Sequence, residues 1–510
     1  MSGRRIGCGC LLLIGLIASA ETSTVGWRGD GSGVYPVATP PLRWSSEAAV
    51  VWRQAMPGAT ASTPLLIGDR LITLADPHWL LAVDTDSGDE LWRVALSTDA
   101  LTAPETLAAV ERLAEQRHAL WEQKKALEVE LAAATGDTGQ LQARIDALEA
   151  ERKALPKMDL KPQHGVGHSC PTPVSDGASI WVLLHSGVVA CVSVDGELRW
   201  SRMLRPASMG YGQSMSPALA GDILGLHIDD HFFGLDAATG ELRWRTDETQ
   251  HQGSPLAVPL GAGRWCFLGT AGSVFAASDG TRLADFGFPA MSRFGTAVLR
   301  GDTAWWIAEG RALVHCRFAW HSGALQLDKG HVTIDQGTFY ASPLLVDGRA
   351  YLWDNVDYSR KDKHLLVWDL TERRQLLSQP TPVGGWAYTS PTAAGAFVFV
   401  QGSNGDTVVY RPGQERVAIG PDRFRQQFVL KEVARNAIGE KIWAHPIFRG
   451  RDMYLRSFAH LYRIRASDAD LALAERLAGQ LDGAADDAPA TDEDEGGLLD
   501  ELEAVDLGGL

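Results

Sequence analysis

A short motif that returns along the chain constrains the fold more than any other feature. Its fullest copy spans residues 236–244 (DAATGELRW), and further copies span residues 84–92 and, in shorter form, 194–200. In each copy Asp with Thr or Ser starts a tight turn, Gly supplies a positive φ, and the next strand carries a Trp that can fill the space between two sheets. A recurring unit of this kind predicts a repeat fold.

A second element precedes each copy. A Ser or Thr followed by Pro opens a strand, a Gly or Asp turn follows, and a second apolar strand comes next. The eight openings are Ser62-Thr63-Pro64, Thr172-Pro173, Ser216-Pro217, Ser254-Pro255, Gly295-Thr296-Ala297, Ser342-Pro343, Ser390-Pro391 and His445-Pro446. Units of about four short strands, spaced about 40–50 residues apart, are typical of β-propeller blades.

The last unit lacks its outer strand, and the beginning of the repeat region supplies a candidate for it. Residues 48–54 (AAVVWRQ) resemble the missing strand. A ring closed in this way has no exposed sheet edge. The sequence therefore predicts an all-β protein, an eight-bladed β-propeller of four-stranded antiparallel blades over residues 21–467.

The Asp-x-x-Thr-Gly-x-x-x-Trp motif resembles the repeats of pyrroloquinoline-quinone-like (PQQ-like) β-propellers. Quinoprotein alcohol dehydrogenases and the non-catalytic outer-membrane assembly lipoprotein BamB share these repeats. The opening residues 26–34 (GWRGDGSGV) are similar to the start of secreted PQQ-like repeat proteins of planctomycete-type bacteria. The resemblance covers residues 26–467 apart from one insertion. It implies the fold and leaves the function open, because function depends on sites carried by a fold.

The N-terminus has the features of a secretory signal peptide over residues 1–20. Arg4 and Arg5 form a basic start, residues 10–20 are an apolar run, and Ala18-Ser19-Ala20 is a small-x-small cleavage site. The run is shorter than the about 20 residues that span a bilayer. We expect cleavage and export to the periplasm or the medium, with no transmembrane segment afterwards; an uncleaved anchor is the alternative.

Residues 101–157 do not follow the repeat. They are rich in Ala, Glu, Leu, Gln and Lys, and Leu113, Leu120 and Leu127 stand seven residues apart. This periodicity predicts a helical hairpin of coiled-coil type inserted between blades 1 and 2, which turns near residues 135–139. Arg117 and Lys124 interrupt its apolar stripe. The hairpin either packs on the propeller or projects as a partner-binding arm.

The C-terminal residues 468–510 predict a short helix and then a disordered acidic tail. From Asp482 onward there are 11 acidic residues and no basic one, out of a net charge of −16 for the chain. The remainder is nearly balanced, which argues against a nucleic-acid partner. Residues 497–503 (GLLDELE) are either an amphipathic docking motif or part of the solvated tail.

The positions of the cysteines indicate whether the chain could hold a quinone cofactor. By resemblance, a quinoprotein dehydrogenase would hold its quinone between a Trp and a disulfide of adjacent cysteines, beside a Ca²⁺ bound by Glu, Asn and Asp. We expect Cys170 on an inner strand and Cys191 two strands further out, with Cys266 and Cys316 in different blades, so that all four are free thiols. The mature chain has no adjacent pair and no Cys-x-x-Cys-His haem motif, and we assign no catalytic residue, no metal ligand and no cofactor-binding residue.

The remaining candidates are positional. His164 and His168 precede an inner strand near the axial mouth, where a metal would need a third ligand; the alternative is a pair of polar loop histidines. Residues 385–388 and 211–213 occupy equivalent positions and could line an axial pocket. Residues 84–89 superficially resemble a calcium loop, without the required Glu at its end. Arg28-Gly29-Asp30 matches an adhesion tripeptide by coincidence.

Two functional hypotheses remain. The first is an exported, non-catalytic propeller that serves as a binding platform for a protein or small ligand, at the propeller mouth or at the helical hairpin. The alternative is a divergent PQQ-dependent oxidoreductase, which alone would need PQQ with Ca²⁺.

Overall fold

The structure is a computed structural model. It describes residues 26–97, 104–136, 138–155, 168–205, 213–248, 252–286, 295–308, 312–334, 337, 339–354, 363–419 and 423–482. The predicted signal peptide, His164 and the acidic tail beyond residue 482 lie outside these residues.

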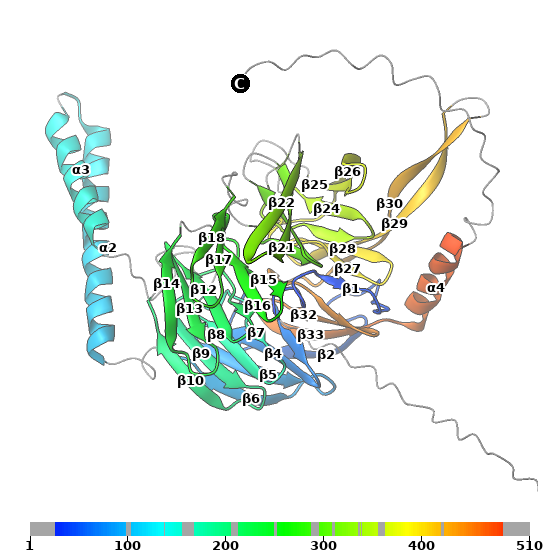
Figure 1. The fold of residues 1–510 in the computed structure, drawn as a ribbon, viewed down its shortest axis with the longest axis horizontal. Coiled ribbons are helices and arrows are strands. Elements are labelled where there is room, and N and C mark those ends of the chain that lie inside the picture. The colour runs from blue at the N-terminus through cyan, green and yellow to red at the C-terminus, as the bar shows by residue number, and fades with distance from the viewer. Residues whose placement is uncertain are drawn as a thin grey trace, which may run out of the picture.

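The eight-bladed propeller is confirmed: eight antiparallel sheets stand around a common axis (Figure 1). The strands of blades 1–4 are β3 Leu65–Ile67, β4 Arg70–Ala75, β5 Trp79–Asp84 and β6 Glu90–Ala95; β7 Val174–Ser175, β8 Ser179–Leu183, β9 Val188–Ser193 and β10 Leu198–Met203; β11 Ala218–Ala220, β12 Ile223–Ile228, β13 His231–Asp236 and β14 Leu242–Asp247; and β15 Leu256–Gly261, β16 Arg264–Leu268, β17 Ser273–Ala276 and β18 Arg282–Asp285.

The strands of blades 5–8 are β19 Val298–Arg300, β20 Thr303–Ala308, β21 Ala312–His321 and β22 Ala324–Thr333; β23 Leu344–Val346, β24 Arg349–Trp353, β25 Lys363–Asp369 and β26 Arg374–Thr381; β27 Thr392–Ala394, β28 Phe397–Gln401, β29 Asp406–Ala418 and β30 Phe424–Ala437; and β31 Ile447–Arg449, β32 Asp452–Arg456, β33 His460–Arg465 and β2 Val50–Ala55.

The last blade is closed by the N-terminal strand, as predicted. β2 pairs antiparallel with β33, from Val50 opposite Ile464 to Ala55 opposite His460. The two ends of the repeat region therefore share one sheet, and the ring of blades has no free outer edge at its seam.

The Trp of the repeat motif joins one blade to the next. The indole N–H groups of Trp52, Trp92, Trp200 and Trp244 donate to backbone carbonyls in the turn of the following blade. The turn glycine makes room for the ring: a Cβ on Gly240, whose φ is +72°, would lie 2.6 Å from the ring of Trp200. These contacts connect blade 8 through blades 1, 2 and 3 to blade 4.

The inserted helical hairpin is also confirmed. Helices α2 Pro104–Ala133 and α3 Gly139–Ala154 pair with each other and stand beside the propeller in Figure 1. The basic residues that interrupt the stripe bind the partner helix: Arg117 Nη1 donates to the carbonyl of Leu155 over 2.9 Å, and Lys124 Nζ lies 3.2 Å from Glu149. They thus tie the two helices together.

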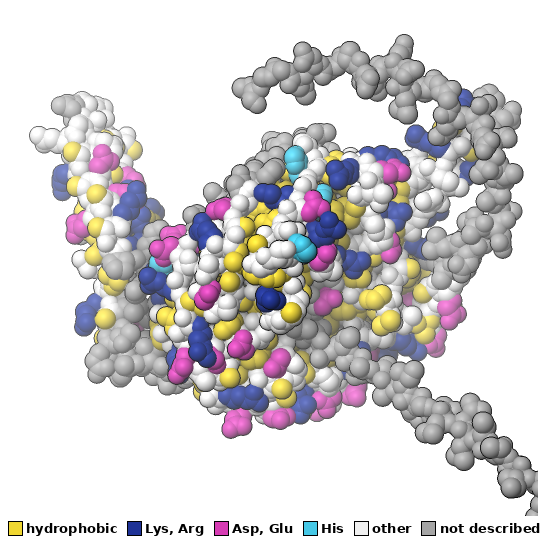
Figure 2. Space-filling model, viewed as in Figure 1, with side chains coloured by type: hydrophobic (Ala, Val, Ile, Leu, Met, Phe, Trp, Pro, Cys, Tyr) yellow, Lys and Arg dark blue, Asp and Glu magenta, His cyan; other side chains and the backbone are white. Residues whose placement is uncertain are grey.

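The third helix, α4 Asp468–Asp482, follows the last blade. Ser467 and Asp470 cap its start, because each side chain accepts the backbone N–H of the other. Within the described part of the chain, no helix is long and apolar enough to cross a membrane. Figure 2 shows acidic and basic side chains interspersed over the visible face.

A closed ring of hydrogen bonds surrounds the propeller axis. Two residues before each inner strand, a backbone N–H donates to the side chain of the equivalent residue in the next blade. The donor–acceptor pairs are Thr63–Thr172, Thr172–Ser216, Ser216–Ser254, Ser254–Thr296, Thr296–Ser342, Ser342–Ser390, Ser390–His445 and His445–Thr63. We call this set the polar ring, and the face on which the inner strands begin the entry face.

His445 occupies a place in the polar ring that Ser or Thr fills in the other blades. Its Nε2 accepts the N–H of Ser390 over 2.8 Å and must therefore carry no proton, while Nδ1 lies 3.3 Å from the hydroxyl of Thr63. Burial, with a contribution from the nearby Arg28 charge, lowers the pKa of His445 well below its usual 6.5. The ring requires a neutral imidazole.

We predict that this histidine makes the propeller acid-sensitive. The unfolded chain takes up a proton at His445 below about pH 6.5 and the folded chain does not, so stability falls by about 1.4 kcal/mol per pH unit there. The variant His445→Thr should lack this component. Urea unfolding of both proteins between pH 7.5 and 5 measures the difference; parallel pH profiles would contradict the assignment.

Candidate functional site: the axial channel and its entry face

The N-terminal segment, residues 26–35, fills the axial channel. Trp27 packs edge-on against the ring of His445 with centroids 5.5 Å apart, and a Cβ on Gly26 would touch Val174 of blade 2. Its end, β1 Val34–Tyr35, pairs in parallel with the inner strand β27. The segment thus reaches inner strands on different sides of the ring, which is possible only on the axis, where Figure 1 shows β1.

We call residues 26–35 the plug, and Arg28 is its central residue. Its side chain is buried, and its guanidinium donates to the carbonyls of Pro343 and Pro391 over 3.1 and 2.6 Å. It also lies 5.1 Å from the ring of Trp27. Burial lowers the pKa of Arg28 to about 10, so the group stays charged at neutral pH. Because the guanidinium faces the channel, the Arg-Gly-Asp tripeptide is not displayed for adhesion.

The entry face carries a cluster of aromatic side chains beside the plugged channel. Its members are Tyr340, Trp386, Tyr388, Trp443 and Phe458. Each ring contacts at least one other member, with the two ring centroids 4.9–6.1 Å apart. Trp386 is 39 % exposed and Tyr388 is 38 % exposed. We call these five residues the aromatic arc.

Three members of the aromatic arc occupy the same position in successive repeat units of the sequence. Tyr340, Tyr388 and Trp443 each stand two positions before a polar-ring residue of blades 6, 7 and 8. In blades 1–4 the same position holds the smaller or polar Ala61, Cys170, Ser214 and Gln252. The mouth is therefore aromatic on one side only. Comparing this position between units would have revealed the arc.

The residues predicted to line an axial pocket, 385–388 and 211–213, differ in how exposed they are. Trp386 is fixed by its backbone, which exchanges hydrogen bonds with Ser403 over 2.7 and 3.0 Å, and it is exposed. Gln213 is completely buried, with its amide donating to the carbonyl of His227 over 2.7 Å. Tyr211 and Gly212 lie outside the described residues. Of the described residues of these two loops, Gln213 therefore does not line an open pocket.

His168, which is half-buried, adjoins a buried polar cluster between blades 2, 3 and 4 that sequence analysis missed. Its carbonyl accepts the N–H of His185, whose Nδ1 accepts the N–H of Gln213. Thr270 hydrogen-bonds His227 over 3.1 Å, and Glu248 approaches the N–H of Ala271. Burial raises the pKa of Glu248 to about 7. Each contact crosses a blade boundary or fixes a turn, so the cluster joins blades.

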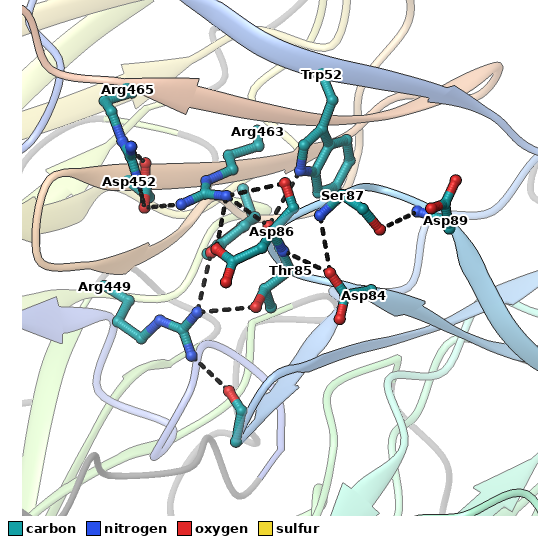
Figure 3. A network of polar contacts seen from close by, with 12 residues as sticks. Trp52, Asp84, Thr85, Asp86, Ser87, Asp89, Arg449, Asp452, Arg463 and Arg465 are labelled. Carbon is teal, nitrogen blue, oxygen red and sulfur yellow. Dashed lines mark hydrogen bonds and ion pairs between the residues drawn. The ribbon is translucent and has the colours of Figure 1, made fainter.

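No metal-binding group emerges from the described residues. Among them, no three His, Cys, Asp or Glu side chains are arranged to hold an ion. In the calcium-like loop, Asp84 accepts the N–H groups of Asp86 and Ser87, and Asp86 pairs with Arg463 over 2.9 Å (Figure 3). The carboxylates thus stabilise the turn and its contact with blade 8.

Ser457, His460 and Glu440 lie together on blade 8, but they are not arranged as a catalytic triad. Glu440 binds both the hydroxyl of Ser457 and, over 2.8 Å, Nδ1 of His460. In a catalytic triad the histidine would accept the serine proton. Here the carboxylate binds both groups, and Ser457 is completely buried.

The four cysteines of the described chain are free, as expected. One position was wrong: Cys170 lies in the loop before β7 and not on an inner strand, because the Ser/Thr-Pro opening precedes each strand by two residues. Cys191 lies on β9, two strands out, and Cys266 and Cys316 lie in blades 4 and 5. Burial raises the pKa of both latter thiols to about 12, so they are poor nucleophiles.

We predict that the plug depends on space at Gly33. Gly33 and Gly31 both have positive φ, of +70° and +88°, but only a Cβ on Gly33 would strike Arg28, 2.5 Å from Nε. Gly33→Ala should lower the free energy of unfolding by about 2 kcal/mol more than the matched Gly31→Ala, because it adds overlap to the same backbone strain. Urea titration of both variants tests this, and equal losses would contradict it.

Comparisons with known proteins agree with the architecture. A family model described as outer membrane protein assembly factor BamB matches residues 46–140 and 128–285. Among solved structures, BamB from Moraxella catarrhalis is 10% identical, with 82% of this chain and 97% of that chain covered and a TM-score of 0.49. Quinohemoprotein alcohol dehydrogenase from Comamonas testosteroni is 10% identical, with 82% and 78% covered and a TM-score of 0.48. Superpositions this loose carry no argument about activity. No curated protein gave a match.

The limits of the family match have a structural explanation. Residues 46–285 contain β2 and blades 1–4, the part of the ring joined by the Trp contacts. The outer strands β18, β22, β26 and β30 contain no Trp. The eight blades and this match to the repeat over residues 46–285 support a place for the chain in the PQQ-like β-propeller superfamily.

Proposed function

We propose that this protein is an exported, non-catalytic binding platform, and that the aromatic arc is its principal contact surface. The observation that carries the proposal is the combination of a channel filled by residues 26–35 with exposed aromatic rings directly beside it. Since the axis is occupied by the chain itself, the entry face is where a ligand or protein would bind.

The physical chemistry of the aromatic arc favours recognition. Trp and Tyr provide large, stiff contact surfaces that lose little conformational entropy on binding, and they are frequent in binding hot spots. The rings of Trp386 and Tyr388 are nearly parallel, with an interplanar angle of 16°, and both side chains are exposed. Their loop is held by the neighbouring turn at Ser403 before any ligand arrives. The surface is thus pre-organised.

The residues present do not fit the quinone site that the family resemblance implies. That site needs adjacent cysteines in a disulfide, whereas the four cysteines described here are separate, free thiols. Near the axis, the side chains of Arg28 and Trp27 contact the openings of the inner strands of blades 6, 7 and 8. A PQQ-dependent oxidoreductase remains the alternative function, and the experiment below includes its activity.

The helical hairpin is a second candidate contact. Leu120, Leu127 and Ile145 are buried between its helices, whereas Trp121 is 37 % exposed and Val129 is 71 % exposed. Exposed apolar residues on an arm beside the main domain are suited to a protein partner. Export to the periplasm or medium, which rests on the N-terminal signal, would place both surfaces outside the inner membrane.

We predict that partners recovered by cross-linking and co-purification from the native host depend on these surfaces. Trp386→Ser with Tyr388→Ser should reduce recovery at least tenfold. Leu91→Ser with Leu242→Ser, two exposed positions on outer strands, is the matched control and should retain it. Deleting residues 104–155 tests the hairpin separately.

Two outcomes would contradict the platform. One is an unchanged set of partners in the arc variant and in the hairpin deletion. The other is dye-linked oxidation of alcohols or sugars that requires added PQQ and Ca²⁺, which would establish the oxidoreductase instead.

A further inference from the structure

The longest hairpin of the propeller extends beyond its blade. β28 pairs with β29 only over residues 407–410, whereas β29 continues to Ala418, paired with β30 from Phe424. Residues 411–418 and 424–431 therefore form a two-stranded ribbon with no third strand, seen projecting from the propeller in Figure 1. A two-stranded ribbon in water has exposed edges and little stability of its own.

The end of this ribbon is both basic and apolar. Ile419 is 54 % exposed and Phe424 is 48 % exposed. Arg416, Arg423 and Arg425 are also exposed, and the guanidinium of Arg416 lies 4.0 Å from the ring of Phe424. We call these five residues the ribbon tip. Further down, Phe428 and Leu430 are buried against blades 6 and 7, so the exposed large apolar side chains of the described ribbon are those of the tip.

The chain contains a segment with complementary properties. Residues 483–510 carry acidic groups and no basic one, and residues 497–503 (GLLDELE) combine three leucines with three carboxylates. The apolar side chains of such a segment suit Ile419 and Phe424, while its carboxylates suit the three arginines. Apart from the tail the chain is nearly balanced in charge, and the tip gathers three exposed arginines.

The segment starts close enough to reach the tip. Helix α4, after which it begins, packs Leu473 and Ala474 into the same apolar cluster as Val433 of β30, and Figure 1 shows α4 beside the ribbon. Leu498 follows Asp482 by 16 residues, and such a length spans up to about 50 Å when extended. The projecting part of the ribbon is only about 25 Å long.

We propose that residues 497–503 dock on the ribbon tip, with their leucines on Ile419 and Phe424 and their carboxylates on Arg416, Arg423 and Arg425. This contact covers the exposed apolar tip and the adjoining strand edge, and so opposes pairing between ribbons of two molecules. It is independent of the aromatic arc and of the function proposed for that surface.

The test uses a fluorescein-labelled peptide of residues 494–507 titrated into the protein that ends at residue 482. We expect saturable binding by anisotropy, and at least fivefold weaker binding to the full chain, whose own tail competes at high effective concentration. Arg416→Glu, Arg423→Glu and Arg425→Glu together should weaken peptide binding at least tenfold. Reversing the exposed Arg202, Arg245 and Arg300 on other blades is the matched control and should leave it unchanged.

Several results would overturn the proposal. Absence of saturable binding to the shortened protein is one, and equal binding by the ribbon variant and its control is another. The ribbon tip also resembles a surface that contacts anionic lipid. If vesicles of phosphatidylcholine and phosphatidylglycerol bind the full and shortened proteins equally, and do so through the three arginines, the tip is a membrane contact and not the tail's site. Circular dichroism checks that each variant is folded.

Discussion

The polar ring is the constraint on which the rest of the structure depends. Each of its hydrogen bonds passes from one blade to the next, and the last returns to the first, so every inner strand is placed by its neighbours. A buried backbone N–H without a partner costs about 1–3 kcal/mol. The ring provides that partner in every blade and fixes the position of the loops two residues before it, including those of the aromatic arc.

The guanidinium of Arg28 occupies the channel inside the polar ring. Arg28 is stabilised by the carbonyl dipoles of Pro343 and Pro391 and by the face of Trp27. The same charge acts on His445, which must stay neutral to accept its hydrogen bond. The axial segment and the closing strand β2 both come from residues 26–55, so the propeller is complete only when these residues are in place.

Local patterns made most of the fold predictable, and long-range contacts account for what was missed. Turn glycines, Ser/Thr-Pro openings and the outer-strand Trp are repeated signals, which is why eight blades, the closing strand and the helical hairpin could be derived. The Ser and Thr residues were found as strand openers, but their role needs a partner in another blade. Residues 26–33 have no strand periodicity, and nothing in them indicates burial on the axis. The aromatic arc was visible only in part, through Trp386 and Tyr388, because its members belong to separate units.

The most direct test of this account is hydrogen–deuterium exchange of the N-terminal segment. If residues 26–35 fill the channel, their peptides should exchange slowly, close to those of the inner strand β27 with which β1 pairs. Exchange of these residues as rapid as that of the neighbouring exposed Val37 would contradict the account, because it would show an open channel and return the axis to the list of possible ligand sites.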